Sequence, residues 1–582
     1  MNKVYNTVWN ESIGMWVVTS ELTRKGGQRP RQIRRTVLAG LVAGLLLPSA
    51  PTLATAWDSV TLGSGGTSGS MTLNAGDTAN NTTINSGGRQ YVSSGGSATS
   101  TTINSGGWQN VYSGGSATST TINSGGRQHV SSGGSATSTT INGGGLQIVS
   151  SGGSATSTTI NSDGQQNVFS GGSATSTTIN GGLQYVSRGG SATSTTINNG
   201  WQNVYNSGSA TSTTINGGLQ AVYSGGSATS TTINSDGWQN VFSGGSATST
   251  TINGGWQDVF IGGSATSTTI NSGGGQAVYS GASATSTTIN GGLQVVSRGG
   301  SATSTTINSG GRQHVSGGGS ATSTTINSGG WQAVYSGGSA TSTTINSDGQ
   351  QNVFSGGSAT STTINAGLQY VSSGGSATST TINGGWQYVS SGGSATSTTI
   401  NSGGQQNVSS GGSATSTTIN NGWQNVYNSG SATSTTINGG LQAVYSGGSA
   451  TSTTINSDGW QNVFSGGSAT STTINSGGWQ AVYSGGSATS TTINSGGQLS
   501  VFSGSAVDIT QNSGGAIETD TSSRSKSGSR RTHMPAAGHD FSLNLLYQML
   551  RHLCFTSVMD SSVRDFSVTY TGEQGTPYPH FH

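Results

Sequence analysis

Apolar residues recur along most of this chain at a fixed short spacing, separated by serine, threonine, asparagine and glycine. The tripeptide Thr-Ile-Asn occurs 23 times between Ile84 and Ile493, which gives a mean period of about 18.6 residues. One alanine and one valine keep fixed positions around each isoleucine. Self-similarity at so short a period is typical of a stacked solenoid and not of a conventional globular core.

One copy of the repeat, residues 97–115, predicts two strands joined by glycine turns. The first strand, Ala98–Ile103, is rich in β-branched residues, and the second is Trp108–Tyr112. The glycine-rich segments between them tolerate positive φ. Because side chains alternate along a strand, Gln109 and Val111 share one face. We expect this face to lie inside, since its residues scarcely vary between copies whereas the first position of the strand does.

Some copies have 18 residues and others 19, and the missing residue usually falls in the turn after asparagine. A glycine turn absorbs such a change, whereas a slip within a strand would turn every side chain to the other face. The pattern therefore predicts an all-β fold, an elongated β-solenoid (β-helix) of about 23 coils with an 18–19-residue period. We expect Ile, Val and Ala inside, and polar ladders of Asn104 and Gln109 with their equivalents between coils.

The two ends of the chain follow other patterns. Basic residues at 29–35, an apolar run at 37–47 and small residues beyond it predict a targeting segment over residues 1–56, with cleavage at Ala54 or Ala56. Residues 57–83 form an N-terminal cap of degenerate repeat, 84–502 the repeat solenoid and 503–521 a degenerate terminal coil. We expect residues 522–582 to be an unstructured or out-of-frame tail, because the repeat is lost there and the only cysteine appears.

Charge and composition exclude several classes of function. The net charge of +2 arises from bases in the first 35 residues, so the repeats have no basic stripe for nucleic acid. The repeat aspartates occur singly, so the paired carboxylates of a glycosidase are absent from the pattern. Cys554 and the histidines near it lack zinc-ligand spacing. We predict no catalytic residue, no metal site and no cofactor.

Hydroxyl groups are the first candidates for function, as acceptors of glycans. Only outward-facing hydroxyls can carry a sugar, and the alternative is that threonine merely suits strands and bonds between coils. A bare, flat Thr-x-Thr row would instead indicate ice binding. The candidate acceptors are Ser97, Thr99, Ser100, Thr101, Thr102, Ser116, Thr118, Ser119 and Thr120.

Aromatic residues are the second candidates, as an interaction surface. They recur at the first position of the second strand and again four residues later, on one face. Such a strip would bind glycans or another rod, or its rings would only stack on neighbouring coils and shield the ladder. The candidates are Trp108, Tyr112, Trp201, Tyr205, Trp238, Trp256, Trp331, Trp423 and Trp460.

The leader and the repeats resemble known sequences. Residues 1–5 (MNKVY), Trp9 and residues 16–24 (WVVTSELTR) resemble the extended signal peptide of Gram-negative autotransporters. Together with the Ser-Gly-Gly-Ser-Ala-Thr repeats, the chain resembles the AIDA/TibA group of self-associating autotransporter adhesins over residues 1–521. The resemblance implies a β-helical passenger exported through the Sec route and periplasm to the cell surface. Such passengers promote self-aggregation, adhesion and biofilm.

The same resemblance implies three partners: a second copy of the chain, the host cell surface, and a cytoplasmic heptosyltransferase that modifies repeat Ser and Thr before export. Chains of this group end in a membrane-spanning barrel, for which the last sixty residues are too few. The sequence therefore leaves anchoring in the outer membrane open. A truncated fragment without function is the alternative to a functional adhesin.

Overall fold

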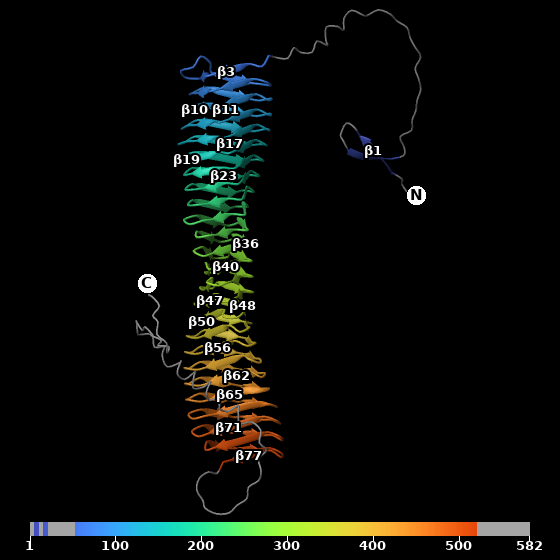
Figure 1. The fold of residues 1–582 in the computed structure, drawn as a ribbon, viewed down its shortest axis with the longest axis vertical. Coiled ribbons are helices and arrows are strands. Elements are labelled where there is room, and N and C mark those ends of the chain that lie inside the picture. The colour runs from blue at the N-terminus through green and yellow to red at the C-terminus, as the bar shows by residue number, and fades with distance from the viewer. Residues whose placement is uncertain (1–4, 11–14, 21–52, 521–582) are drawn as a thin grey trace, which may run out of the picture. The chain divides into compact units, whose positions relative to one another are not determined.

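The computed structural model describes residues 5–10, 15–20 and 53–520. In the leader, β1 (Tyr5–Asn10) and β2 (Met15–Ser20) form an antiparallel pair. Residues 53–520 form an elongated stack of short strands, which runs without interruption along this part of the chain (Figure 1). Among the described residues, no helix is long and apolar enough to cross a membrane.

Each coil of the stack contains three strands, represented by β9 (Ser97–Thr99), β10 (Thr102–Ile103) and β11 (Trp108–Val111). Equivalent strands of successive coils pair in parallel and build three sheets of 25 strands each. We call them the first, second and third sheet, in the order of these strands. With about 4.8 Å between paired strands, the stack is about 115 Å long.

The first coil contains β3 (Ala56–Asp58), β4 (Thr61–Leu62) and β5 (Ser70–Leu73). The last contains β75 (Ser505–Val507), β76 (Thr510–Gln511) and β77 (Ala516–Thr519). The all-β solenoid expected from the repeat is confirmed. The domain limits expected from the sequence stay predictions, and the tail expected at 522–582 lies outside the described residues.

The prediction of two strands per coil was wrong, because the segment 98–103 is bent at Ser100. This serine has φ of 55°, in the left-handed region, and separates β9 from β10. The bend explains how both Ala98 and Ile103 can face the interior. They are five residues apart, and a single continuous strand would place them on opposite faces. With the corner between them, both side chains are buried.

The register between coils is strict. Gln109 pairs with Gln128 and Val111 with Val130, so every side chain stacks on its equivalent. The same alignment survives where the period falls to 18 residues, as for Gln166 and Gln184. The shorter copies therefore lose their residue in a turn, as the sequence predicts, and no strand slips.

The interior combines an apolar column with a polar one. Ala98, Ile103 and Val111 are fully buried, and so are their equivalents along the stack except in the last coils, where Val501 and Ala506 are partly buried. Beside them, the Gln109 side chain is also fully buried and Thr101 is 1% exposed. A buried amide is costly unless its donors and acceptors are satisfied, so the fate of these polar groups decides whether the core is stable.

The glutamine side chains form a continuous hydrogen-bonded ladder. Gln109 Nε2 donates to Gln90 Oε1 at 2.7 Å and to Thr101 Oγ1 at 3.3 Å. Gln109 Oε1 accepts from Gln128 Nε2 at 2.7 Å and from Thr120 Oγ1 at 3.3 Å. Both amide hydrogens and both lone pairs are used, so the buried amide is fully satisfied. We call this network the glutamine–threonine ladder.

The ladder has a direction and ends in apolar or weakly polar residues. All its amide nitrogens point toward the N-terminal coils, where Gln90 Nε2 donates to Met71 Sδ at 3.6 Å. At the other end, Leu499 occupies the glutamine position and is fully buried. A second, outer ladder connects the asparagines, with Asn104 Nδ2 donating to Asn85 Oδ1 at 2.9 Å. Both polar ladders expected from the sequence are confirmed.

One glycine per coil is required by close packing of the backbone. A Cβ atom on Gly107 would lie 2.4 Å from the carbonyl oxygen of Ile84 in the preceding coil. Every coil of the stack from Gly88 to Gly515 has glycine at this position. The turn between the second and third sheets therefore closes only where no side chain intervenes.

Replacing one glutamine in the middle of the ladder tests how far the network stabilises the stack. In a Gln276→Leu variant, Gln257, Gln294, Thr268 and Thr287 each lose a bond. We expect the free energy of unfolding to fall by roughly 1–3 kcal/mol for each buried group left unpaired. Equilibrium urea unfolding followed by circular dichroism measures the change.

A matched variant at the end of the ladder is Gln480→Leu, whose next neighbour is already Leu499. Because no glutamine follows Gln480 in the ladder, this substitution breaks one glutamine–glutamine hydrogen bond and not two. The free energy of unfolding should therefore fall less. Equal, negligible effects of the two substitutions would contradict a stabilising role for the ladder.

Candidate functional site

The outer faces of the three sheets differ in chemistry. The first and second sheets present the same serine and threonine side chains in every repeat coil, whereas the outward residues of the third sheet vary. Within residues 53–520, no three His, Cys, Asp or Glu side chains lie close enough to hold a metal ion. The residues expected to be functional lie on these outer faces, which are therefore the candidate sites.

The hydroxyls expected to accept glycans divide into three groups. Ser97, Thr99 and Thr102 are half-buried on the outer faces of the first and second sheets, and Ser100 is exposed at the corner between them. The equivalent Ser116, Thr118 and Ser119 of the next coil repeat this pattern. Their acceptor role stays a prediction.

Thr101 and Thr120 are removed from the acceptor candidates by their burial. Each is 1% exposed, and its hydroxyl hydrogen is directed into the glutamine–threonine ladder. A sugar on either oxygen has no space within the coil. The same burial removes the premise of the ice-binding alternative: Thr99 faces outward while Thr101 faces inward, so the Thr-x-Thr motif forms no row on one face of the described coils.

The corner serine has an unusual backbone. Ser100 and its equivalent in each repeat coil have positive φ, a conformation that favours glycine, asparagine or aspartate. In the second and the last coil of the stack, Asn81 and Asp508 occupy the same corner. The Ser100 amide donates to the Thr118 carbonyl of the next coil at 2.9 Å, so the corner is held by the backbone and not by its hydroxyl.

The aromatic candidates lie on the outer face of the third sheet. Trp201 is 54% exposed, and Trp238, Trp423 and Trp460 are 43–45% exposed. Trp108, Trp256 and Trp331 are half-buried, and the Arg127 guanidinium carbon lies 5.3 Å from the Trp108 ring centre. The tryptophan column is thus partly covered by neighbouring coils and partly open to solvent.

A second column begins at Tyr112, four residues after Trp108. Within it, Tyr205 and Tyr223 stack with ring centres 5.1 Å apart and an interplanar angle of 2°. Phe242 stacks on Phe260 at 4.9 Å. Both readings of the aromatic strip therefore have support: the rings do stack between coils, and several tryptophans remain exposed.

A third column, at the position of Asn110, was missed by reasoning from the sequence. It contains Tyr185, Tyr370 and Tyr388, and the last two stack at 5.0 Å. Coils with a ring or branched aliphatic residue at this position have serine at the Tyr112 position, and coils with tyrosine or phenylalanine there have Asn, Ala, Asp or Ser at the Asn110 position. Of the 23 coils from Arg89 to Gln498, only the one containing Asn407 and Ser409 departs from this rule, with neither position bulky.

The reciprocal pattern has a steric cause and was visible in the repeats. Residues two apart on a strand project from the same face, so bulky groups at both the Asn110 and the Tyr112 position would compete for the same space between neighbouring coils. Where two rings do lie two residues apart, as Trp386 and Tyr388 do, they meet edge to face with ring centres 6.2 Å apart. Where serine replaces the ring, the neighbouring column uses the space: His129 Nε2 lies 3.0 Å from Ser150 Oγ of the next coil. Nearly every coil therefore has one bulky group at these two positions, in addition to the residue at its Trp108 position.

The predicted cleavage positions lie at the entrance to the first coil. Ala56 opens β3, and the Thr55 amide donates to Asp77 Oδ1 at 2.8 Å. Hydrogen bonds from the backbone of Asn74 and Thr55 lower the pKa of Asp77. Cleavage at Ala54 or Ala56 stays a prediction.

Burial of the tyrosines predicts a loss of stability in alkali. Burial, with smaller contributions from Tyr370 and Tyr427, raises the pKa of Tyr388 to about 12 from an ordinary 10.0. The folded chain holds this proton more tightly than the unfolded chain does. The contribution of the protonated Tyr388 to the free energy of unfolding is therefore complete below pH 10. It should be lost as the pH rises toward the folded pKa.

We expect the free energy of unfolding to fall between pH 10 and about pH 12, and less steeply in Tyr388→Phe. Urea unfolding across this range, with phenolate absorbance recorded in parallel, measures both. A free energy independent of pH in this window would contradict a raised pKa for the buried tyrosines.

Two families match parts of this chain. Residues 1–50 match the Extended Signal Peptide of Type V secretion system. Residues 58–107, 104–145 and 437–478 match the Adhesin of bacterial autotransporter system, probable stalk. The first match falls in the leader and the others fall within the stacked coils.

Individual proteins with similar repeats are autotransporters. The chain is 69% identical over 93 residues to Autotransporter CRAC of Citrobacter rodentium (strain ICC168), covering 16% of this chain and 6% of that protein. It is 66% identical over 92 residues to the Autotransporter adhesin/invasin TibA of Escherichia coli O78:H11 (strain H10407 / ETEC), covering 16% and 9%. The matched segments thus span less than a tenth of either relative.

Among solved structures, a TibC-catalyzed hyper-glycosylated TibA55-350 fragment is similar, with 52% identity, coverage of 54% of this chain and 94% of that one, and a TM-score of 0.35. The signal peptide and the repeats together imply export to the cell surface. On this evidence from its leader and its repeats, the chain is an autotransporter adhesin passenger of the AIDA/TibA type.

Proposed function

We propose that this chain is a glycosylated rod that mediates bacterial self-aggregation, adhesion to host cells and biofilm formation. The observation that carries the proposal is the chemical division of its surface. Two sheets present identical hydroxyls in every repeat coil, and the third presents a platform of tryptophan, tyrosine and phenylalanine. Under this proposal the first two faces carry sugars and the third makes contacts.

Repetition supplies the strength of such contacts. An exposed tryptophan or a stacked tyrosine contributes a modest free energy to binding, because much of its surface already contacts neighbouring coils. When many coils engage one partner surface, each contact after the first is effectively intramolecular, and the overall avidity exceeds any single affinity. A second copy of the rod offers the same spacing, which suits homotypic contacts between cells.

Ser100 and its equivalents are the acceptors that the geometry supports best. Except at Ser490, whose hydroxyl donates to Asp508 Oδ2 at 2.7 Å, their side chains are exposed and their hydroxyls have no hydrogen-bond partner within the described part of the chain. The left-handed conformation costs serine about 1 kcal/mol relative to glycine. Serine is nevertheless present at the corner of every repeat coil, so we infer that the hydroxyl itself is used. Its partner would be a cytoplasmic heptosyltransferase that acts before export.

Substituting corner serines by asparagine tests this assignment. The substitution removes the hydroxyl but keeps a residue that suits the left-handed corner, since Asn81 occupies it naturally. The chain is co-expressed with TibC as the modifying enzyme, and glycopeptides are weighed by mass spectrometry. We expect the altered coils to lose most of their sugar. The substituted residues are Ser194, Ser212, Ser230, Ser249 and Ser267.

The matched control replaces outward threonines of the same coils by valine, which suits a strand. It should keep most of its glycan. Full glycan mass on the asparagine variant, with loss in the valine variant, would place the acceptors on the second sheet instead. The control residues are Thr196, Thr214, Thr232, Thr251 and Thr269.

Clustering of beads coated with the purified glycosylated chain tests the contact surface. Changing four exposed tryptophans to glutamine, a residue that other coils have at this position, should slow clustering by about tenfold through lost avidity. Light scattering follows the rate. The substituted residues are Trp201, Trp238, Trp423 and Trp460.

A control on another face of the same region replaces first-sheet serines by glutamine, at Ser209, Ser246, Ser431 and Ser468. It should cluster at the normal rate. Clustering that is unaffected by the tryptophan changes would reject the third sheet as the contact surface. Absence of clustering by the unaltered chain would favour the alternative of a fragment without this function.

A further inference from the structure

Two arginines occupy a corner position that serine has in most coils. Arg188 and Arg298 directly follow the third sheet, at the place of Ser113, and both have positive φ, 48° and 53°. In both coils the preceding residue is a serine, Ser187 or Ser297, where many other coils have a ring. An arginine thus appears at the corner only where the aromatic column is interrupted.

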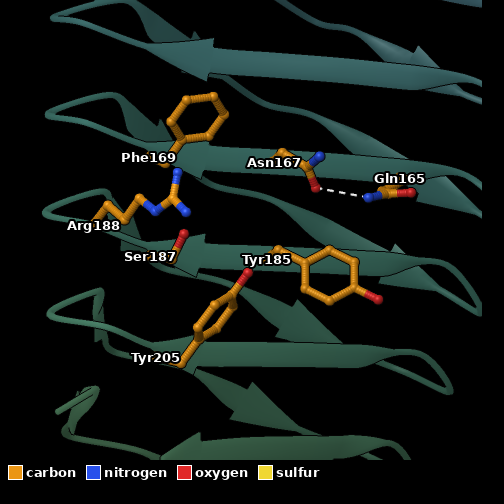
Figure 2. A pocket seen from close by; sticks show the side chains of 7 residues that line it. All are labelled: Gln165, Asn167, Phe169, Tyr185, Ser187, Arg188 and Tyr205. Carbon is orange, nitrogen blue, oxygen red and sulfur yellow. Dashed lines mark hydrogen bonds between the residues drawn. The ribbon is translucent and has the colours of Figure 1, made fainter. Parts of the chain in front are cut away.

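The interruption at Ser187 leaves an open depression of about 350 Å³. It spans three successive coils, through β20 (Gln165–Phe169), β23 (Leu183–Ser187) and β26 (Trp201–Tyr205). Figure 2 shows the Arg188 guanidinium beside the Phe169 ring and above Ser187. The Tyr205 hydroxyl is directed toward the same space from the coil below.

The charge in this depression is not balanced by the protein. Its lining has no carboxylate: besides Arg188 it consists of Gln165, Asn167, Phe169, Tyr185, Ser187 and Tyr205. Within residues 53–520 the guanidinium of Arg188 takes part in no hydrogen bond or ion pair. A guanidinium presents a planar fork of donors that matches a carboxylate or sulfate. An anion is therefore the complementary ligand group.

The other lining groups favour a sugar as the bearer of that anion. Aromatic faces carry negative charge density and attract the C–H groups on the flat side of a sugar ring. The Gln165 and Asn167 amides, joined by a 2.8 Å hydrogen bond, and the Tyr185 and Tyr205 hydroxyls provide donors and acceptors for sugar hydroxyls. The depression is shallow and polar, so it offers no apolar pocket to anchor a peptide side chain.

We propose that the depression at Arg188 binds an acidic saccharide, with the guanidinium holding a carboxylate or sulfate and Phe169 and Tyr205 flanking the sugar ring. The proposal rests on the role of the third sheet as the contact surface. It adds to that role a specific ligand class and a single place on the rod.

The depression at Arg298 also combines a corner arginine with a serine and neighbouring rings, but the rest of its lining differs, and it therefore serves as an internal control. Its lining includes Asp258, whose carboxylate offsets the arginine charge. Burial and the Asp258 charge raise the pKa of Tyr279, and Arg298 partly opposes this rise, so both charges act on one ring. In the coil that follows, Ser316 stands where Tyr205 closes the Arg188 depression. We expect this second depression to bind acidic sugars weakly.

Binding of defined oligosaccharides to the full, unglycosylated chain tests the proposal, with isothermal calorimetry as the measurement. The probes are a glucuronate-containing oligosaccharide, a sulfated galactan oligosaccharide, a neutral glucan of equal length and a glutamate-rich peptide. Arg188→Ser and Arg298→Ser restore the commonest residue at their position, and Tyr205→Ser copies other coils, so all three should fold.

We expect one or both acidic saccharides to bind, about tenfold more weakly in Arg188→Ser and in Tyr205→Ser, with little change in Arg298→Ser. The uronate and sulfate probes distinguish the two anions. Equal binding of the neutral glucan would overturn the role of Arg188, and equal binding of the acidic peptide would overturn the sugar assignment. Because these measurements use the isolated chain, loss of bead clustering with intact saccharide binding would reject the rod's adhesive role and not this site.

Discussion

The in-register stacking of identical coils is the constraint on which the rest of the molecule depends. Each buried glutamine satisfies its neighbours only if the next coil places the same amide at the same height, as Gln109 does between Gln90 and Gln128. A coil with another residue there would leave buried donors and acceptors unpaired, at a cost of roughly 1–3 kcal/mol each. The near-identity of the repeats follows from this requirement, because every coil must match the hydrogen-bonding groups of the coils on both sides of it.

The same constraint separates the invariant part of the chain from the variable part. Glutamine, threonine, isoleucine, valine and alanine point inward and must match between coils, whereas outward residues of the third sheet contact their neighbours more loosely. Variation there follows its own rule, since a ring at the Asn110 position excludes one at the Tyr112 position. The platform can therefore change in chemistry along the rod, and the interruption beside Arg188 is one such change.

Much of the fold could be predicted from the sequence because a repeat gives the same information more than twenty times. The 18- and 19-residue periods located the turns, and the unvarying Gln109 and Val111 positions identified the inner face. The bend at Ser100 was missed, since Thr-Ser-Thr-Thr contains no glycine or proline and reads as continuous strand. The odd spacing of Ala98 and Ile103 was the signal that a corner intervenes. With that corner overlooked, the buried Thr101 could not be told from its exposed neighbours among the acceptor candidates.

The sequence by itself determined the period, the β class, the apolar interior and the positions where turns must fall, because these depend on local propensity and on alternation along a strand. Only the tertiary structure decided which hydroxyls are accessible, which tryptophans are covered and which charges lack a partner. Those properties depend on contacts between residues about 19 positions apart, in neighbouring coils. They also depend on the corner at Ser100, which sets the direction of the side chains that follow it. The side chains of Thr99 and Thr101 differ little in sequence context, yet one faces solvent and the other completes the hydrogen bonding of a buried amide.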